Sequence, residues 1–264
     1  MTLEDLKERG KNDVRRAYDA GYTLGTSQGG GGYDQGYTAG VEAGKKSQYD
    51  EFWDAYQENG NRTVYEFAFA GKGWTDETFK PKYDINQSGA YATQMFQGSL
   101  ITDLVGILEA QNIRLNTSGC RNLGQLMYNV VFPVVPPIDF SNAIGTNNYA
   151  FTSPNIVTIQ KLIVSENTKW HATIFNGATA LENLVIEGTI GQPGFDVKDS
   201  KKLSKASFVS IVNAFSTTVD LSATFSKQAV NTAFETSVGA GDGSTSAEWL
   251  ALLDTRPNCT ISLI

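Results

Sequence analysis

The sequence predicts an α/β solenoid, a fold in which short strand-containing repeats stack and share one core. Two observations predict it. Aromatic anchors recur at Phe96, Tyr128, Phe151 and Phe175, with spacings of 32, 23 and 24 residues. Each anchor is followed by an apolar pattern, and the most regular units, AFTSPNIVTIQKLIV and IFNGATALENLVI, end in a short β-branched run. No single unit could bury both of its faces alone, so neighbouring units must share a core.

The repeats occupy residues 91–264, which we expect to form one cooperative solenoid. Their spacing is in the range of leucine-rich repeats, where each unit supplies one short strand and a looser return segment. The residues expected inside are Phe96, Phe151, Leu162, Phe175, Leu184 and Ile186.

A duplicated motif dominates residues 1–47, which we predict to be a Gly/Tyr-rich helical assembly segment. The string YDAGYTLG recurs as YDQGYTAG, on either side of the glycine run 29–32. On a helix this spacing places a tyrosine stripe beside a glycine stripe. Because a helical glycine costs about 1 kcal/mol relative to alanine, the stripe indicates close approach of a second helix; a flexible linker is the alternative. The candidate contact residues are Tyr18, Gly21, Tyr22, Gly25, Tyr33, Gly36, Tyr37, Gly40 and Gly44.

An aromatic block spans residues 48–90, where we predict an N-terminal cap for the solenoid. Residues 47–58 have the pattern of a short helix with its aromatic side chains on one face, and residues 65–69 alternate like a half-buried strand. Such a block is typical of a packed cap, and a carbohydrate-stacking surface is the alternative. Its main aromatic residues are Phe52, Trp53, Tyr56, Tyr65, Phe67, Phe69, Trp74 and Phe79.

Beyond residue 191 the pattern changes to helices that alternate with strands, as expected of enlarged last repeats and a terminal cap. Thr245, with Glu248 three residues later, predicts a capping box at the start of the last helix. The predicted elements are helices over 203–215 and 227–236, a helix around Trp249 and Leu252, and strands over 218–221 and 260–264.

Few residues are suited to catalysis or metal binding. The chain has one histidine, His171, and no GxSxG motif accompanies it, so neither a histidine metal site nor a nucleophilic triad is predicted. The cysteines, Cys120 and Cys259, lie far apart without a CxxC partner and indicate two isolated thiols. The glycine-rich string 239–243 lacks the lysine of a phosphate loop and the acidic ligands of an EF-hand. We predict no catalytic residue, no metal and no cofactor.

Composition and charge exclude several classes of protein. With 264 residues, 41% of them hydrophobic and 19% charged, the chain is predicted to be globular and not disordered. Its net charge of −7 argues against nucleic acid as a partner, because that binding needs clustered Lys and Arg. The charged N-terminus lacks the apolar region of a secretory signal peptide, and no apolar stretch is long enough to span a membrane. We expect synthesis in the cytoplasm without export.

Two long strings carry a resemblance to a known family. They are EFWDAYQENGNRTVYEFAFAGKGWTDETFKPKYDI at 51–85 and FNGATALENLVIEGTIGQPGFDVKDSKKLSKASFVSIVNAF at 175–215. Residues 86–264 resemble the BspA-like leucine-rich-repeat family, and the two strings are similar to the leader and the terminal repeats of members encoded by bacteriophages and prophages of gut Firmicutes. One unit departs from the family pattern, because VVFPVVPP at 130–137 stands where a plain strand and turn are expected.

The resemblance implies a right-handed solenoid with a role in virion structure or attachment, and it implies no reaction. We expect a non-enzymatic bacteriophage structural or attachment protein of the tail, fibre or neck, located in the virion. Its expected partners are other virion proteins and a host-surface protein or glycan. Resemblance to phage fibres implies a homo-oligomer, with a trimer preferred. The alternatives are a bacterial cell-surface adhesin with the same repeats and a carbohydrate-active enzyme.

Overall fold

The computed structural model describes residues 69–71, 74–81, 84–86, 92–145, 147–235 and 246–264. The chain divides into two compact units, Met1–Gly60 and Asn61–Ile264, and every described residue belongs to the second. The assembly segment 1–47, the helix predicted at 47–58 and the aromatic residues before Phe69 therefore lie outside the described residues.

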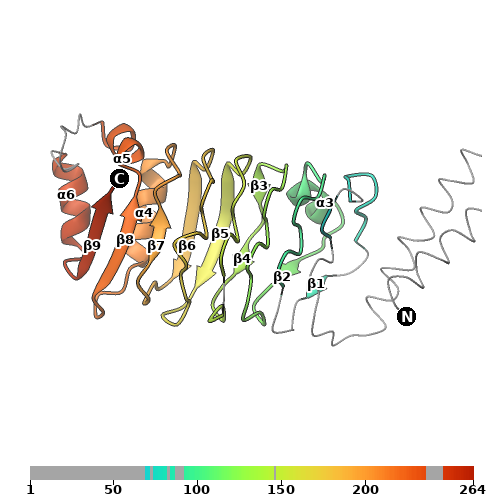
Figure 1. Ribbon diagram of the computed structural model, residues 1–264, viewed down its shortest axis with the longest axis horizontal. Coiled ribbons are helices and arrows are strands. Elements are labelled where there is room, and N and C mark those ends of the chain that lie inside the picture. Colours follow the sequence, from blue (N-terminus) through green and yellow to red (C-terminus); the bar gives the residue numbers. More distant parts are fainter. Residues whose placement is uncertain (1–68, 72–73, 82–83, 87–91, 146, 236–245) are drawn as a thin grey trace, which may run out of the picture. The chain divides into compact units, whose positions relative to one another are not determined.

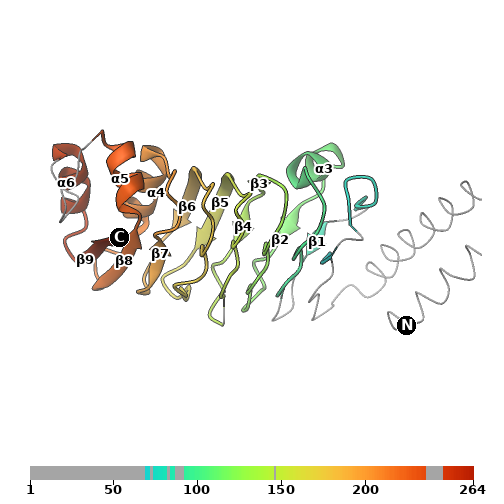
Figure 2. The same ribbon diagram turned by 45° about the horizontal axis from the view of Figure 1, so that its top comes forward.

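Parallel strands follow one another in chain order along the second unit (Figure 1). Figure 2 shows the same succession of coils side by side, with helices replacing part of the coil near both ends of the described chain. Among the described residues, the strand pairs form three parallel sheets. The strands are β1 (Ile85–Asn86), β2 (Leu115–Asn116), β3 (Val134–Val135), β4 (Ile138–Asp139), β5 (Thr158–Val164), β6 (Asn183–Gly188), β7 (Phe195–Val197), β8 (Leu221–Phe225) and β9 (Cys259–Leu263).

Four helices lie in the described part of the chain, one between β1 and β2 in sequence and three after β7. None of these helices is long and apolar enough to cross a membrane. They are α3 (Leu104–Ala110), α4 (Lys205–Ala214), α5 (Lys227–Ala233) and α6 (Ala247–Asp254).

A turn with the same backbone geometry recurs before three of the four buried anchors, Phe96, Met127 and Phe151. Gln94, Gln125 and Tyr149 have φ angles of 59°, 55° and 56°, in the left-handed region that residues other than glycine seldom adopt. Each stands two residues before an anchor, and the anchor amides bond to the next coil: Phe96 N–H to the carbonyl of Leu126 at 3.0 Å, and Met127 N–H to that of Ala150 at 2.8 Å. Three left-handed residues at matching places show that the coils repeat one local conformation.

The second anchor differs from the sequence prediction. Met127 is fully buried and occupies the place of Phe96 and Phe151, whereas Tyr128, the predicted anchor, is half-buried beside Tyr149. The prediction was wrong by one residue because an aromatic residue was preferred to the methionine before it. The two side chains share the turn, and backbone register decides which one enters the core.

The proline-rich unit 130–137 keeps the register of the coils. Its strand is interrupted by Pro136 and Pro137, which have no N–H to donate, so two short strands, β3 and β4, stand on either side. Both pair with β5 at the same offset, Val134 opposite Thr158 and Ile138 opposite Leu162. A bulge in β5 between Ile159 and Leu162 adjusts its other edge to β6.

The core of the coils contains an almost unbroken column of aromatic rings. All six residues that were expected inside are buried, which confirms that part of the prediction. Phe175 stacks on Phe151 with ring centroids 5.5 Å apart and contacts Phe195 at 5.7 Å. The rings of Phe140, Phe151, Phe175, Phe195, Phe215 and Phe225 follow one another through the coils.

Buried polar side chains also join neighbouring coils. The Asn147 carboxamide accepts a hydrogen bond from the N–H of Leu123 at 2.9 Å and donates one to the carbonyl of Ala143 at 3.0 Å. Ser153 donates to the Val130 carbonyl at 2.8 Å in the same manner. Such bonds satisfy backbone groups where turns leave them without a strand partner.

Helix α4 closes the edge of β6 with serine hydroxyls. The N–H of Leu184 donates to Ser207 Oγ at 2.9 Å, and the N–H of Ile186 donates to Ser210 Oγ at 2.8 Å. Ser207 Oγ in turn donates to the Glu182 carbonyl at 2.9 Å. The hydroxyls thus take the hydrogen bonds that a further strand would take, and this sheet ends at β6.

The C-terminal elements match the predicted order, with two corrections. The helices predicted from 203 and 227 begin at Lys205 and Lys227, and the last strand is β9, as expected. The strand predicted over 218–221 is instead β8, because residues 217–220 are exposed and form the turn before it. The N-cap of α6 is Ser246 and not the predicted Thr245, which lies outside the described residues; Ser246 Oγ accepts from the N–H of Trp249 at 3.3 Å. Glu248, the other residue of the predicted capping box, pairs instead with Lys205 at 2.5 Å.

The described part of the aromatic block is packed. Phe69 and Phe79 are fully buried, with ring centroids 5.0 Å apart, and Trp74 and Phe96 lie against them. Phe69 stands at a turn and not inside a strand. These residues fit the packed cap better than the stacking surface.

Candidate functional site

The nine residues predicted to make assembly contacts lie outside the described residues. The structure therefore gives no geometry for the duplicated Tyr/Gly motif. The residues concerned are Tyr18, Gly21, Tyr22, Gly25, Tyr33, Gly36, Tyr37, Gly40 and Gly44.

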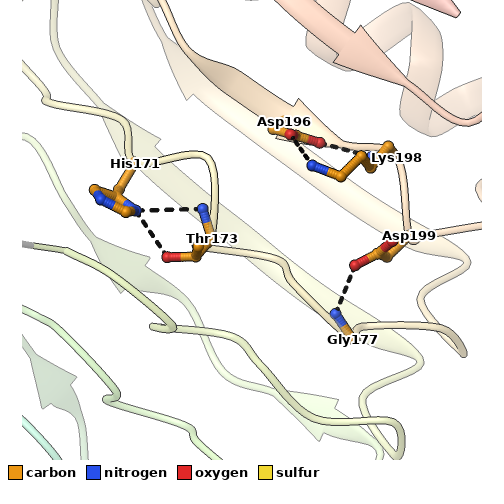
Figure 3. A network of polar contacts seen from close by, with 6 residues as sticks. All are labelled: His171, Thr173, Gly177, Asp196, Lys198 and Asp199. Atoms are coloured by element: carbon orange, nitrogen blue, oxygen red, sulfur yellow. Dashed lines mark hydrogen bonds and ion pairs between the residues drawn. The ribbon is translucent and has the colours of Figure 1, made fainter. Parts of the chain in front are cut away.

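His171 stabilises a turn. Its side chain is exposed, and Nδ1 lies 2.7 Å from Thr173 Oγ1 and accepts from the N–H of Thr173 at 3.4 Å (Figure 3). Both partners are two residues away, so the contacts are local. In the part of the chain that the structure describes, no group of three or more His, Cys, Asp or Glu residues could hold a metal ion.

A carboxylate network fixes the turn after β7, next to this loop. The nearly buried Asp196 accepts from the backbone N–H of Lys198 at 3.0 Å and from its Nζ at 2.7 Å. Asp199 accepts from the N–H of Gly177, on the preceding coil, at 3.0 Å. In Figure 3 the Asp196 carboxylate is held by Lys198 within the turn, and the Asp199 carboxylate reaches Gly177 on the preceding coil. The hydrogen bond to Asp196, with the charges of Asp196 and Asp199, raises the pKa of Lys198, so this lysine stays cationic.

A cleft of about 740 Å³ opens beside this turn. One wall is the turn itself, with Lys198 and Lys201; the other is α5, which begins at Lys227. The helix starts there because Ser226 Oγ accepts from the N–H of Ala229 at 3.4 Å. The lining residues are Lys198, Asp199, Lys201, Ser226, Lys227, Gln228, Asn231, Thr232 and Ile264.

The walls of this cleft, named here the lysine cleft, contain three lysines and one buried acceptor without a hydrogen-bond partner. The lining holds Lys198, Lys201 and Lys227 together with the carboxylate of Asp199, and Lys198 is paired with Asp196 at 2.7 Å. The Oδ1 atom of Asn231 is buried and has no hydrogen-bond partner. An orphaned buried acceptor is unfavourable by about 1–3 kcal/mol unless a ligand or water donates to it.

A second, smaller cleft of about 300 Å³ lies between α3 and the proline-interrupted strand. Its lining is largely apolar, with Leu108, Ile113 and Pro136 on its walls and Arg114 and Glu109 beside them. It can hold one apolar side chain or a small ring. The charges of Arg114 and Glu109 are of opposite sign, and none of the unpaired buried polar atoms of the described residues lies in this lining.

Cys120 and Cys259 are both thiols and do not form a disulfide bond. Burial, with the nearby charge of Asp139, raises the pKa of Cys120 to about 12, and burial raises that of Cys259 to about 11. A thiol with so high a pKa is a poor nucleophile near neutral pH.

The lysine cleft was not predicted from the sequence, although the sequence contains one signal for it. The string KDSKKLSK at 198–205 holds four lysines in a chain whose net charge is −7. The contribution of Lys227 and Asn231 could not be foreseen, because only the fold brings α5 beside this string. Comparisons with protein-family models, with curated proteins and with solved structures each found no match.

Proposed function

We propose that the chain is a non-enzymatic structural or attachment protein of a bacteriophage virion, built as a leucine-rich-repeat solenoid of the BspA-like type. The observation that carries the proposal is the succession of parallel coils from β1 to β9, because stacked repeats offer an extended surface for contact. The resemblance of residues 51–85 and 175–215 to phage-encoded proteins supports the virion as its place.

The outward side of β5 and β6 supports a role in contact. Gln160, Val185 and Glu187 expose their side chains there, and Lys161 bridges to Glu187 at 2.6 Å across the two strands. A surface of mixed polar and apolar groups on a rigid sheet suits a protein or glycan partner. The lysine cleft adds a concave site near the C-terminal end of the same stack.

The roles of several carboxylates favour a structural protein over a glycosidase. Asp196 and Asp199 fasten the turn after β7, and Asp103 caps α3 by accepting from the N–H of Gly106 at 2.8 Å. Glycoside hydrolysis requires two carboxyl groups free to flank a substrate. All three accept hydrogen bonds from backbone N–H groups, Asp196 and Asp103 within their own coils and Asp199 from the preceding coil.

Electron microscopy of purified phage particles with a gold-labelled antibody against the chain tests the proposal. We expect gold at one place on the tail, fibre or neck of each particle. Gold confined to the envelope of uninfected bacteria would overturn the virion assignment and identify the chain as a cell-surface adhesin.

We propose further that the chain assembles as a homo-oligomer, with a trimer preferred, through its duplicated Tyr/Gly motif. Light scattering compares the full chain, the double variant Gly36→Val and Gly40→Val, and a chain that begins at Gln48. We expect the full chain alone to be oligomeric, since valine side chains block close approach of helices. If all three are monomers at micromolar concentration, self-association through this segment is wrong.

A further inference from the structure

We infer that Asn176, which is followed by Gly177, is a site of spontaneous deamidation, and that Asp199 restrains the reaction. The inference goes beyond the proposed function and does not depend on it. It rests on three observations: an Asn-Gly pair at an exposed corner, the left-handed backbone of Gly177, and the hydrogen bond from the Gly177 N–H to Asp199.

The reaction joins the backbone to the side chain of the preceding asparagine. The nitrogen of Gly177 attacks the carboxamide carbon of Asn176, its proton leaves with the side-chain nitrogen as ammonia, and a succinimide ring remains. Water then opens the ring at either of its carbonyl groups and yields aspartate or isoaspartate. Water is the only other reactant. Glycine after the asparagine favours the attack, because no Cβ hinders the approach of the two groups.

The corner at Asn176 leaves the side chain able to react. Asn176 directly follows the buried Phe175, but its own side chain is exposed, and among the described residues its carboxamide has no hydrogen-bond partner. Gly177 has a φ angle of 71°. The matching corner of an earlier coil has Gln97 before Gly98, whose φ angle is 63°. Glutamine would have to close a larger ring, so we expect the reaction at Asn176 and not at Gln97.

The acceptor of the Gly177 N–H differs from that at the matching corner. There, the N–H of Gly98 donates to the backbone carbonyl of Tyr128, on the next coil, at 2.9 Å. At Gly177 the carboxylate of Asp199 takes the place of that carbonyl, at 3.0 Å (Figure 3). The proton that has to leave is therefore held by a side chain, which a substitution can remove.

Two effects of Asp199 oppose the attack. A hydrogen bond to a charged acceptor is stronger than one to a neutral carbonyl, so the proton is held more firmly on the nitrogen. The attack also places negative charge on this nitrogen and then on the oxygen of the carboxamide, and a nearby carboxylate disfavours further negative charge. Lys198 offsets little of this repulsion, because its ammonium group is paired with Asp196 at 2.7 Å. Removal of Asp199 should therefore accelerate the reaction.

Deamidation would loosen this corner of the coil. Isoaspartate inserts a methylene group into the main chain at residue 176, next to Phe175, whose ring stacks on Phe151 at 5.5 Å. Aspartate places a second carboxylate near Asp199. Either product weakens the connection between this coil and the turn after β7, which the hydrogen bond from Gly177 to Asp199 provides.

Peptide mapping by mass spectrometry tests the inference on the full chain, incubated at pH 8. The readout is the fraction of Asn176 converted to aspartate or isoaspartate, and the other Asn-Gly pair of the sequence, Asn59–Gly60, is the internal reference. We expect Asn176 to react more slowly in the native chain than in the same chain unfolded by urea. A residue that does not react even in urea would overturn the site, and a native rate equal to or above the unfolded rate would overturn the restraint.

Two variants test the role of Asp199. Asp199→Ala removes acceptor and charge and should raise the rate at Asn176 about fivefold or more, with the rate at Asn59 unchanged. Asp199→Asn keeps an acceptor oxygen without the charge, so its rate should lie between those of the parent chain and Asp199→Ala. The matched control is Asp220→Ala, at an exposed turn, which should leave both rates at their parent values.

The variants also define the results that would refute the role of Asp199. In Asp199→Ala with native circular dichroism, an unchanged or lower rate at Asn176 would show that Asp199 does not restrain the reaction. An equal rise at Asn59 would show a general loosening of the chain and would refute it as well. If Asp199→Ala does not fold, the rate in Asp199→Asn decides: a rate at or below that of the parent chain refutes the restraint.

Discussion

Replacement of Ser207 by alanine tests whether helix α4 closes the sheet through its hydroxyls. Ser207 is 3% exposed, and its Oγ both accepts from Leu184 and donates to the carbonyl of Glu182. In Ser207→Ala the N–H of Leu184 loses its acceptor in a place that water does not reach. The carbonyl of Glu182 keeps a partner, because the N–H of Ser204 also donates to it, at 2.8 Å.

The expected loss of stability follows from the single group, the N–H of Leu184, that is left without a hydrogen-bond partner. One orphaned buried donor is unfavourable by about 1–3 kcal/mol. Alanine is the better helix former by about 0.5 kcal/mol, which offsets part of the loss. We expect the free energy of unfolding to fall by about 1–2 kcal/mol. Ser210→Ala should have a smaller effect, since Ser210 is only half-buried and water can replace its hydroxyl.

Urea unfolding followed by tryptophan fluorescence measures the stability, and amide hydrogen exchange at Leu184 measures the edge itself. The exposed Ser222, on β8, supplies the control variant Ser222→Ala, which should leave both readouts near those of the parent chain. If Ser207→Ala changes the free energy of unfolding by less than about 0.3 kcal/mol and leaves exchange at Leu184 unchanged, the hydroxyl does not support the edge of β6.

Three further predictions concern the core, the thiols and the histidine. Phe175→Ala should lower the free energy of unfolding by roughly 3–5 kcal/mol, and a loss below about 1 kcal/mol in urea titration would contradict its place in the ring column. Iodoacetamide at pH 8 should label Cys120 and Cys259 far more slowly in the native chain than in the urea-unfolded chain, because their raised pKa values, about 12 and about 11, keep both thiols protonated. The same pKa shifts should lower the free energy of unfolding as the pH rises above about 9, where the thiols of the unfolded chain ionise. His171→Ala should leave cell binding or infectivity intact and change stability by less than about 0.5 kcal/mol, and a loss of binding at unchanged stability would refute this.

Elements with strong periodicity could be predicted from the sequence. The regular units around Phe151 and Phe175 gave the long strands β5 and β6, since alternating or continuous apolar runs bury one face of a strand. Helix α4 followed from the helical spacing of its apolar residues, and α6 from a capping-box signal whose predicted N-cap, Thr245, lies one residue before the actual N-cap Ser246. Local signals of this kind need no knowledge of neighbouring coils.

Features that depend on register between coils could not be predicted. Met127 and Tyr128 are adjacent and both suit an anchor, and the inter-coil hydrogen bonds select Met127. Ser207 has the sequence signature of an ordinary helical serine, and its role depends on the distant N–H of Leu184. The lysine cleft likewise joins Lys201 to Asn231, which only the packing of α5 brings together.

The serine-closed edge of β6 has a consequence for how this protein could change length during evolution. Pairing between β4, β5 and β6 repeats along the coils, whereas α4 needs only the single edge that β6 offers. A duplicated circuit inserted before β6 would extend the sheet and still meet the same hydroxyls. A circuit inserted after β6 would break the hydrogen bonds between β6 and these hydroxyls. Related chains of different length should therefore vary in the number of circuits before α4 and keep the segment that follows this helix.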